Sequence, residues 1–168
     1  MSRQELTIAG VGGQGSILAG VILGSAAVSY DKKYAVQTQA YSAELRGGFA
    51  AAWVVVSDEP VLFPRVTRPD ILVAQAQDSM DRFGSVLNPE GILIYDSDLI
   101  PSIPDDIKNA YEIKATALAR SKFNTTIVCN MIMLGALCSI TGVVSRQALE
   151  TAIEESVPKG KEEMNLKA

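Results

Sequence analysis

A glycine-rich loop near the N-terminus is the first place where this sequence could do chemistry. The loop reads Gly10-Val11-Gly12-Gly13-Gln14-Gly15 and connects an expected strand, Leu6–Ala9, to an expected buried helix, Ser16–Val28. Glycines let the backbone turn tightly, and the free N–H groups at the start of a helix attract an anion. Two interpretations stay open. In one, the loop binds an anion or a cofactor phosphate. In the other, it is a tight connection from strand to helix that packs against other backbone or against another subunit.

A dinucleotide site would need an acidic residue at the end of the second strand, where it holds the ribose hydroxyls. Asp31 has the expected spacing of about 20 residues from the loop, but it precedes the expected second strand, Tyr34–Gln39, instead of ending it. Glu44 is the nearest acid beyond that strand. The sequence therefore gives only weak support to a site for NAD or FAD.

The second candidate is a turn rich in polar and small residues. It reads Tyr41-Ser42-Ala43-Glu44-Leu45-Arg46-Gly47-Gly48. The two glycines let the backbone approach a ligand or partner closely, and the Arg46 guanidinium can hold a carboxylate or phosphate through two hydrogen bonds. The alternative is an Arg46–Glu44 pair on a solvated loop, which contributes little stability. We expect this turn and the glycine loop to form one surface at the carboxyl ends of the strands.

Composition excludes several kinds of chemistry. The chain of 168 residues has no histidine, so no Ser-His-Asp triad or imidazole metal ligand can come from it. Cys129 and Cys138 are too few for an iron–sulfur cluster or an all-cysteine zinc site, and we expect two small core residues. Asp96-Ser97-Asp98 is expected to be a loop and cap, with no metal. The net charge of −4 disfavours a nucleic-acid-binding surface.

The elements that must position these loops alternate along the chain. The expected strands are Leu6–Ala9, Tyr34–Gln39, Gly48–Ser57, Ile71–Ala74, Ile92–Tyr95 and Glu112–Lys114, with Val61–Phe63 as a hairpin partner of the third. The expected helices with clear bounds are Ser16–Val28, Ala115–Lys122 and Gln147–Ser156, the last of which starts at Ser145. Another helix is capped by Asp78 or Ser79 and runs to about Leu87, and a long one runs from Thr125 or Thr126 to about Thr141. Lys159–Lys167 is expected to be a polar helix or tail.

This alternation predicts an α/β fold. We expect a single layered domain over residues 1–168, Rossmann-like, with a mixed but mainly parallel sheet and helices on both faces. The apolar stretches fall short of the ~20 residues that a membrane span needs. No signal peptide is visible at the N-terminus. We expect a cytoplasmic chain that binds neither membrane nor nucleic acid.

Four segments together resemble a known family. The glycine loop and the turn Tyr41-x-x-Glu44-x-Arg46-Gly47-Gly48 are similar to those of the gamma subunit of 2-oxoacid:ferredoxin (or flavodoxin) oxidoreductases. Ala115–Ala119 resembles the short Ala-rich helix start of that family, and Asn130–Ala136 resembles its Asn-Met-x-x-Leu-Gly-Ala helix. The motifs occur in the family's order, from about Leu6 to Ile153.

The resemblance implies a subunit that is not catalytic alone. Family members decarboxylate a 2-oxoacid on thiamine diphosphate, pass two electrons through iron–sulfur clusters to ferredoxin, and release an acyl-CoA. It implies that thiamine diphosphate, Mg and the [4Fe-4S] clusters lie on partner alpha, beta and, where present, delta subunits, that no cofactor is bound by this chain, and that CoA is a co-substrate. The amino-acid sequence of the turn looks most like that of the 2-oxoglutarate type.

Alternatives to the 2-oxoglutarate type stay open. Pyruvate, branched-chain 2-oxoacid and indolepyruvate enzymes share much of the pattern, and the acceptor is either ferredoxin or flavodoxin. A stand-alone nucleotide-binding oxidoreductase domain is suggested by the glycine loop alone. The candidate contact residues are those of the two loops, whichever function holds. We also expect the isolated chain to expose apolar surface, which would favour self-association.

Overall fold

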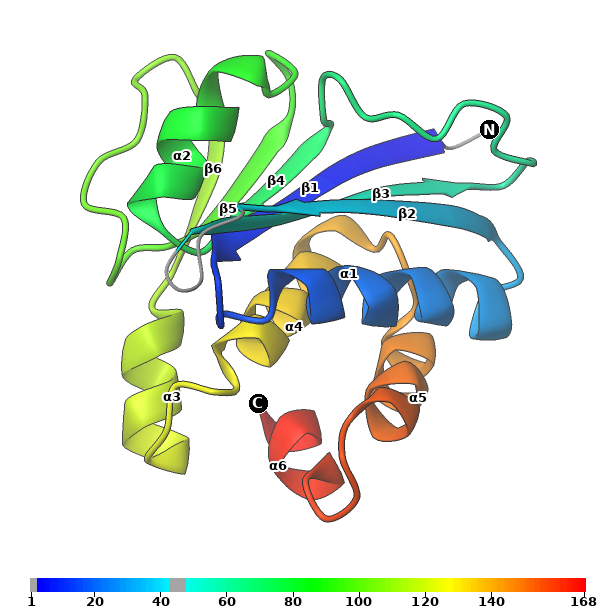
Figure 1. The fold of residues 1–168 in the computed structure, drawn as a ribbon, viewed down its shortest axis with the longest axis vertical. Helices are drawn as coiled ribbons and strands as arrows, with labels where there is room; N and C mark the ends of the chain where they lie inside the picture. Colours follow the sequence, from blue (N-terminus) through cyan, green and yellow to red (C-terminus); the bar gives the residue numbers. More distant parts are fainter. Residues whose placement is uncertain (1–2, 43–47) are drawn as a thin grey trace.

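One mixed sheet organises the chain. The computed structural model describes residues 3–42 and 48–168. In this part six strands form one sheet in the order β2-β3-β1-β4-β5-β6 (Figure 1). The strands are β1 (Arg3–Val11), β2 (Tyr34–Tyr41), β3 (Phe49–Ser57), β4 (Ile71–Ala74), β5 (Ile92–Asp96) and β6 (Asn109–Ile113).

The sheet has an antiparallel part and a parallel part. β3 pairs antiparallel with both β1 and β2, while the pairs β1–β4, β4–β5 and β5–β6 are parallel. Three of the five pairings are therefore parallel. Because β2 and β1 both run opposite to β3, five of the six strands point in one direction and end at the same edge. The expected mixed, mainly parallel sheet is confirmed.

Helices cover both faces of the sheet. They are α1 (Ser16–Ser25), α2 (Gln77–Phe83), α3 (Ala115–Phe123), α4 (Cys129–Thr141), α5 (Arg146–Ser156) and α6 (Glu162–Lys167). A π-helical turn, Ala26–Tyr30, extends α1, and a 3-10 turn, Gly84–Val86, follows α2. Only α2 lies on the upper face in Figure 1, whereas α1, α4 and α5 lie beneath the sheet. None of the helices in the described residues is long and apolar enough to cross a membrane.

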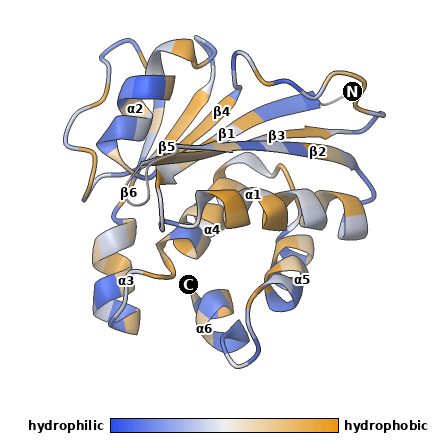
Figure 2. Cartoon of the chain, viewed as in Figure 1, coloured by the Kyte–Doolittle hydropathy of each residue, from blue (hydrophilic) through white to orange (hydrophobic). Residues whose placement is uncertain are grey.

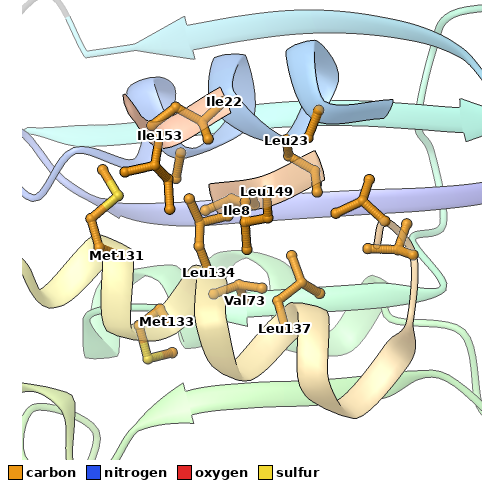
Figure 3. Close-up of a cluster of buried hydrophobic side chains, with 14 of the residues drawn as sticks. Ile8, Ile22, Leu23, Val73, Met131, Met133, Leu134, Leu137, Leu149 and Ile153 are labelled. Atoms are coloured by element: carbon orange, nitrogen blue, oxygen red, sulfur yellow. The ribbon is translucent and has the colours of Figure 1, made fainter. Parts of the chain in front are cut away.

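The alternation of side chains along the strands creates two cores. Leu6 and Ile8 of β1 and Val73 of β4 point to the lower face, where they pack on α1, α4 and α5 (Figure 3). Leu72 and Leu93 point to the upper face, toward Met80 of α2 and Ile100. The sequences of the parallel strands β4 and β5 are thus apolar without alternation, because both faces of these strands are covered. The hydropathy colours show the same apolar strands and the apolar helices α1 and α4 (Figure 2).

Three expectations about elements are wrong. Val61–Phe63 forms no strand: both edges of β3 are already paired with β1 and β2, and prolines 60 and 64 flank the segment. Asp78 and Ser79 lie inside α2, whose N-cap is Ala76, and Asp78 forms an ion pair with Arg82 instead.

The third correction concerns the helix expected from Thr125 or Thr126. It begins at Cys129, because Thr125 Oγ1 accepts a hydrogen bond from Ile127 N in a preceding turn. The other expected strands and helices are present, some with bounds shifted by a few residues. Ser145 caps α5 as expected, since its side chain accepts from Ala148 N. The polar C-terminal segment forms α6.

The packing of α4 on the sheet gives a test of the lower core. We expect Leu137→Ala to lower the free energy of unfolding by about 2–5 kcal/mol, because the side chain is fully buried and its removal leaves a cavity. Ile127→Ala is the matched control, since Ile127 is 76% exposed, and should change stability by less than about 0.5 kcal/mol. Urea unfolding followed by circular dichroism measures both. Equal losses would contradict this core.

Candidate ligand and subunit-contact site

The two loops predicted from the sequence meet at one edge of the sheet. The glycine loop follows β1, and Gly12 N donates a hydrogen bond to Gly48 O over 2.7 Å. Tyr41 ends β2 at the same edge and is 67% exposed. Glu44, Arg46 and Gly47 lie outside the described residues. This edge also contains the carboxyl ends of β4, β5 and β6, the usual place for ligands in an open α/β sheet.

Two glycines of the loop are required by close packing inside the protein. Gly15 has a φ of +77°, and a Cβ there would lie 2.4 Å from Asn130 Nδ2 on α4. A Cβ at Gly10 would lie 2.5 Å from Gln14 Oε1 and 2.8 Å from Ser16 Oγ. A side chain at either position would displace the polar groups that hold the loop. The structure therefore supports the packing interpretation for these two residues.

A chain of side-chain amides holds the loop against the next strand. Gln14 Oε1 accepts from Val11 N at 2.7 Å, and Gln14 Nε2 donates to Gln75 O at 2.9 Å. Gln75, directly after β4, donates from Nε2 to Ser16 Oγ at 2.9 Å. On α4, Asn130 Nδ2 donates to Gly15 O at 3.4 Å. Gln14 is thus part of the support of the loop.

Gly12 and Gly13 differ from their neighbours because both are exposed. Gly13 has a φ of +97°, and a Cβ built on it would meet nothing within 4 Å. Internal packing therefore does not explain glycine at this position, although the backbone conformation does. Gly12 and Gly13, with the adjoining turn at Gly48, form the part of the loop that a ligand or another subunit can reach.

Asp31 is not placed to bind a nucleotide. Its Oδ1 accepts from Ser145 Oγ and its Oδ2 accepts from Ser145 N, both at 2.6 Å. The carboxylate thus holds the start of α5, beyond the C-terminal end of α1, while the glycine loop lies at the N-terminal end of α1. The acid at the fingerprint spacing has a structural role, which weakens the nucleotide-binding alternative.

Sequence reasoning missed Gln75 and Ser16 as supports of the loop. Gln75 is 2% exposed, and its Oε1 has no hydrogen-bond partner among the described residues. A signal was available, because a polar residue directly after the apolar run Ile71–Ala74 lies at the carboxyl end of a buried strand. Asn130 on α4 is a further support, because its amide donates to Gly15 O.

The acidic residues at the end of β5 and directly after it cap the start of α3. Asp96 is 2% exposed and accepts from Thr116 Oγ1 at 2.6 Å, while Asp98 Oδ2 accepts from Ala117 N at 2.6 Å. Both carboxylates thus hold the start of α3. Residues 3–42 and 48–168 contain no cluster of three or more acidic or thiol side chains that could hold a metal.

The two cysteines are free thiols with packing roles. Cys129 Sγ lies 3.7 Å from Ala115 O, and Cys138 Sγ lies 3.2 Å from Val144 O. Burial raises the pKa of both thiols above the ordinary value for cysteine. Neither thiol is therefore poised as a thiolate nucleophile at neutral pH.

A separate groove of about 600 Å³ lies between α4, α5 and α6. Met131, Leu149 and Ile153 are among its apolar lining residues, while Arg146 and Lys167 are among the charged ones. It includes none of the residues that the sequence singled out for a site. The groove is thus separate from the site predicted from the sequence.

The fold is that of the gamma subunit of oxoacid ferredoxin oxidoreductases. Over 98% of its length the chain matches the crystal structure of the gamma subunit of a keto/oxoacid ferredoxin oxidoreductase from Geobacter sulfurreducens, with a TM-score of 0.87 and 38% identity, covering 92% of that chain. It also matches the pyruvate oxidoreductase subunit PORC from Thermotoga maritima, with a TM-score of 0.79 and 25% identity over 99% of this chain and 92% of that one.

The sequence comparison gives the family. The model of the pyruvate ferredoxin/flavodoxin oxidoreductase family matches residues 5–168, and the chain belongs to this family. It is 47% identical to the 2-oxoglutarate synthase subunit KorC of Methanocaldococcus jannaschii, over 99% of this chain and 90% of that protein. It is 48% identical to KorC of Methanothermobacter thermautotrophicus, over 99% of this chain and 91% of that protein. The resemblance seen in the sequence is confirmed.

The glycine geometry predicts different costs at neighbouring positions. Gly15→Ala combines the strain of a positive φ, about 1–2 kcal/mol, with overpacking against Asn130, about 1–3 kcal/mol, whereas Gly13→Ala carries only the strain. Urea unfolding should therefore show a clearly larger loss for Gly15→Ala than for Gly13→Ala. Adding Asn130→Ala to Gly15→Ala should cost less than Asn130→Ala costs alone. Equal losses at the two glycines would contradict the close approach of α4.

The raised thiol pKa values predict slow alkylation. A raised pKa leaves less thiolate at a given pH, so Cys129 and Cys138 should react with iodoacetamide at pH 7.5 several-fold more slowly than an added, exposed cysteine in Ser121→Cys. Their rates should continue to rise above pH 9. A mass-spectrometric time course on intact protein gives the rates. Labelling of all three thiols at the same rate would refute this assignment.

Proposed function

We propose that this chain is the gamma subunit of a 2-oxoglutarate:ferredoxin oxidoreductase. The complex converts 2-oxoglutarate, CoA and oxidised ferredoxin to succinyl-CoA, CO₂ and reduced ferredoxin. The observation that supports 2-oxoglutarate as substrate is the high identity to three KorC subunits of 2-oxoglutarate synthase, 47–48% over 99% of this chain. A fourth KorC, from Archaeoglobus fulgidus, is 33% identical, which is in the range of two ketoisovalerate VorA subunits at 36–37% and two PorC subunits of pyruvate synthase at 30–32%.

Partner subunits must supply the redox chemistry of this reaction. With no histidine and two cysteines, both packed against backbone carbonyls, this chain cannot hold a [4Fe-4S] cluster by itself. We assign thiamine diphosphate, Mg and the clusters to alpha and beta subunits, and to a delta subunit where one is present. The acceptor, ferredoxin or flavodoxin, then meets the complex and not this chain alone.

One group of relatives supports a close association with a larger chain. The matched region of VorA covers 81% of this chain but only 28% of VorA from Methanothermobacter thermautotrophicus. In that protein the equivalent domain is therefore part of a longer polypeptide. A domain that is covalently joined in one relative and separate in another needs an interface that keeps it in place when it is separate.

We assign this interface to the edge formed by the glycine loop and the turn that ends at Gly48. Gly12 and Gly13 are exposed there, next to the N-terminus of α1, and no side chain caps the N–H groups of that helix among the described residues. Such N–H groups attract an anionic group. Arg46 lies outside the described residues, and we assign its guanidinium to the same contact because it can hold a carboxylate or phosphate through two hydrogen bonds. The edge thus suits either the phosphates of CoA or an acidic surface of the catalytic subunits. Tyr41 lies at the same edge.

The first test is purification of the complex through a tag on this chain in its native host. The eluate should contain larger subunits and should reduce a viologen dye in a reaction that needs both 2-oxoglutarate and CoA. Pyruvate and 2-oxoisovalerate are the matched alternative substrates. A strong preference for either would contradict 2-oxoglutarate while retaining the family. A lone inactive protein that binds NAD or FAD would favour the stand-alone nucleotide-binding domain instead.

Substitution of Arg46 tests the interface. In the purified complex, Arg46→Ala should lower CoA-dependent turnover or the yield of assembled complex at least tenfold, since a charge-assisted pair of hydrogen bonds is lost. Arg68→Ala, on an exposed loop away from this edge, is the matched control and should leave both unchanged. Circular dichroism of the isolated variant checks that it folds. Normal assembly and turnover in Arg46→Ala would remove this assignment.

A further inference from the structure

The outer side of α1 is apolar and carries no charge. No residue from Leu6 to Tyr30 is charged. Leu18 and Val21 on α1 and Val28 on the π-helical turn are nevertheless 38%, 44% and 49% exposed. Figure 2 shows that α1 is apolar over much of its length. A surface helix of a globular protein normally presents charged or polar side chains to water, so this side of α1 needs another explanation.

The other helices that the structure describes do not share this feature. α2, α3, α5 and α6 each contain charged residues. α4 is uncharged like α1, but its exposed residues are Gly135 and Ser139, so it presents no large apolar side chain to water. Among the described helices, α1 is thus the one that exposes large apolar side chains and has no charged residue of its own.

The inner side of α1 is used by the fold itself. Ala19, Ile22 and Leu23 belong to the lower core. A Cβ at Gly20 would lie 2.6 Å from Ala52 Cβ, which places this side of the helix against β3. One flank of α1 packs on α4 and α5 (Figure 1). The side that stays exposed is the one on which the chain's own packing makes no demand.

Gly24 interrupts this outer side, and the fold gives no reason for a glycine there. Ile17, Val21 and Gly24 are spaced by four and three residues, so they lie on one side of the helix. A Cβ at Gly24 would meet nothing within 4 Å, and the residue has the negative φ of an ordinary helix. Glycine inside a helix is less favourable than alanine. The notch at Gly24 is therefore explained by the close approach of atoms from outside the chain.

The outer side of α1 is continuous with the edge assigned above to the subunit contact. α1 begins directly after the glycine loop, which exposes Gly12 and Gly13. Gln37 lies on the same face of the sheet as α1, because its Nε2 donates to Ile17 O over 3.3 Å. Tyr41 follows four residues later on β2, so its side chain, in a residue that is 67% exposed, points to the same face. One surface therefore runs from the glycine loop along α1.

We propose that the outer side of α1 binds an apolar, uncharged surface of a larger subunit of the complex, with atoms of that subunit seated over Gly24. Interfaces between permanent subunits are apolar and poor in charged residues, which is the chemistry of this side of α1. A larger subunit is favoured over a second copy, because the equivalent domain of VorA is one part of a longer polypeptide. The inference rests on the proposed function, which supplies the complex.

Substitution of Val21 tests the contact in the complex purified through a tag on this chain. Val21→Glu should lower the yield of co-purified larger subunits at least tenfold, because an unpaired carboxylate would be buried against an apolar surface. Val21→Ile keeps the side apolar and should retain the wild-type yield. Val86→Glu is the matched control and should also retain it, since Val86 is 40% exposed in the turn after α2, on the other face of the sheet. Circular dichroism of the isolated variants should match that of the wild type.

Gly24→Gln tests the notch without a change of charge. Glutamine is a better helix former than glycine, so the isolated variant should unfold at a higher urea concentration than the wild type. The yield of assembled complex should nevertheless fall at least fivefold, because the new side chain would occupy the space of the partner's atoms. A merely structural role for Gly24 would move both measurements in the same direction.

The partner is identified by a photo-crosslinking amino acid in place of Val28 in the complex, which should link to a larger subunit. A link to a second copy of this chain would overturn the inference. So would a wild-type yield in Val21→Glu or in Gly24→Gln, or an equal loss in Val86→Glu. If these variants assemble normally while the complex oxidises 2-oxoglutarate, the inference fails and the proposed function stands. If the wild-type complex prefers pyruvate, the assigned substrate fails and the contact through α1 is still decided by the yields.

Discussion

The close passage of the chain from β1 into α1 is the constraint on which the remainder of the structure depends. Gly10 and Gly15 leave room for Gln14, Ser16 and Asn130 at the carboxyl end of β1. Their hydrogen bonds join this end of β1 to β4 through Gln75 and to α4 through Asn130. This connection from β1 to α1 therefore fixes the positions of β1, β4, α1 and α4. It also leaves Gly12 and Gly13 at the surface.

The same connection from β1 to α1 gives the glycine pattern a packing role on the inner side of the loop. In a dinucleotide-binding fold the glycines make room for a pyrophosphate. In this chain the protein's own amides occupy the inner side of the loop, and Asp31 holds the start of α5. The exposed side of the loop remains for contact with a ligand or a partner.

Much of the fold could be predicted from local sequence, because the apolar runs of β3, β4 and β5 are bounded by turn residues and α5 begins at a capping serine. The errors arose where tertiary structure decides. Nothing local in Val61–Phe63 shows that both edges of β3 are taken. The role of Gln75 depends on Gln14, which is 61 residues away along the chain. The two candidate loops were found from their glycines, and their meeting at Gly12 and Gly48 follows from the strand directions.

The central claim is that this chain is a necessary but non-catalytic subunit of a 2-oxoglutarate oxidoreductase. Omission and reconstitution test it most directly. The partner subunits, expressed without this chain, should show little CoA-dependent oxidation of 2-oxoglutarate, and addition of the purified chain should restore it while the chain alone shows none. Full activity of the partners without this chain, or restored activity with pyruvate in place of 2-oxoglutarate, would contradict the account.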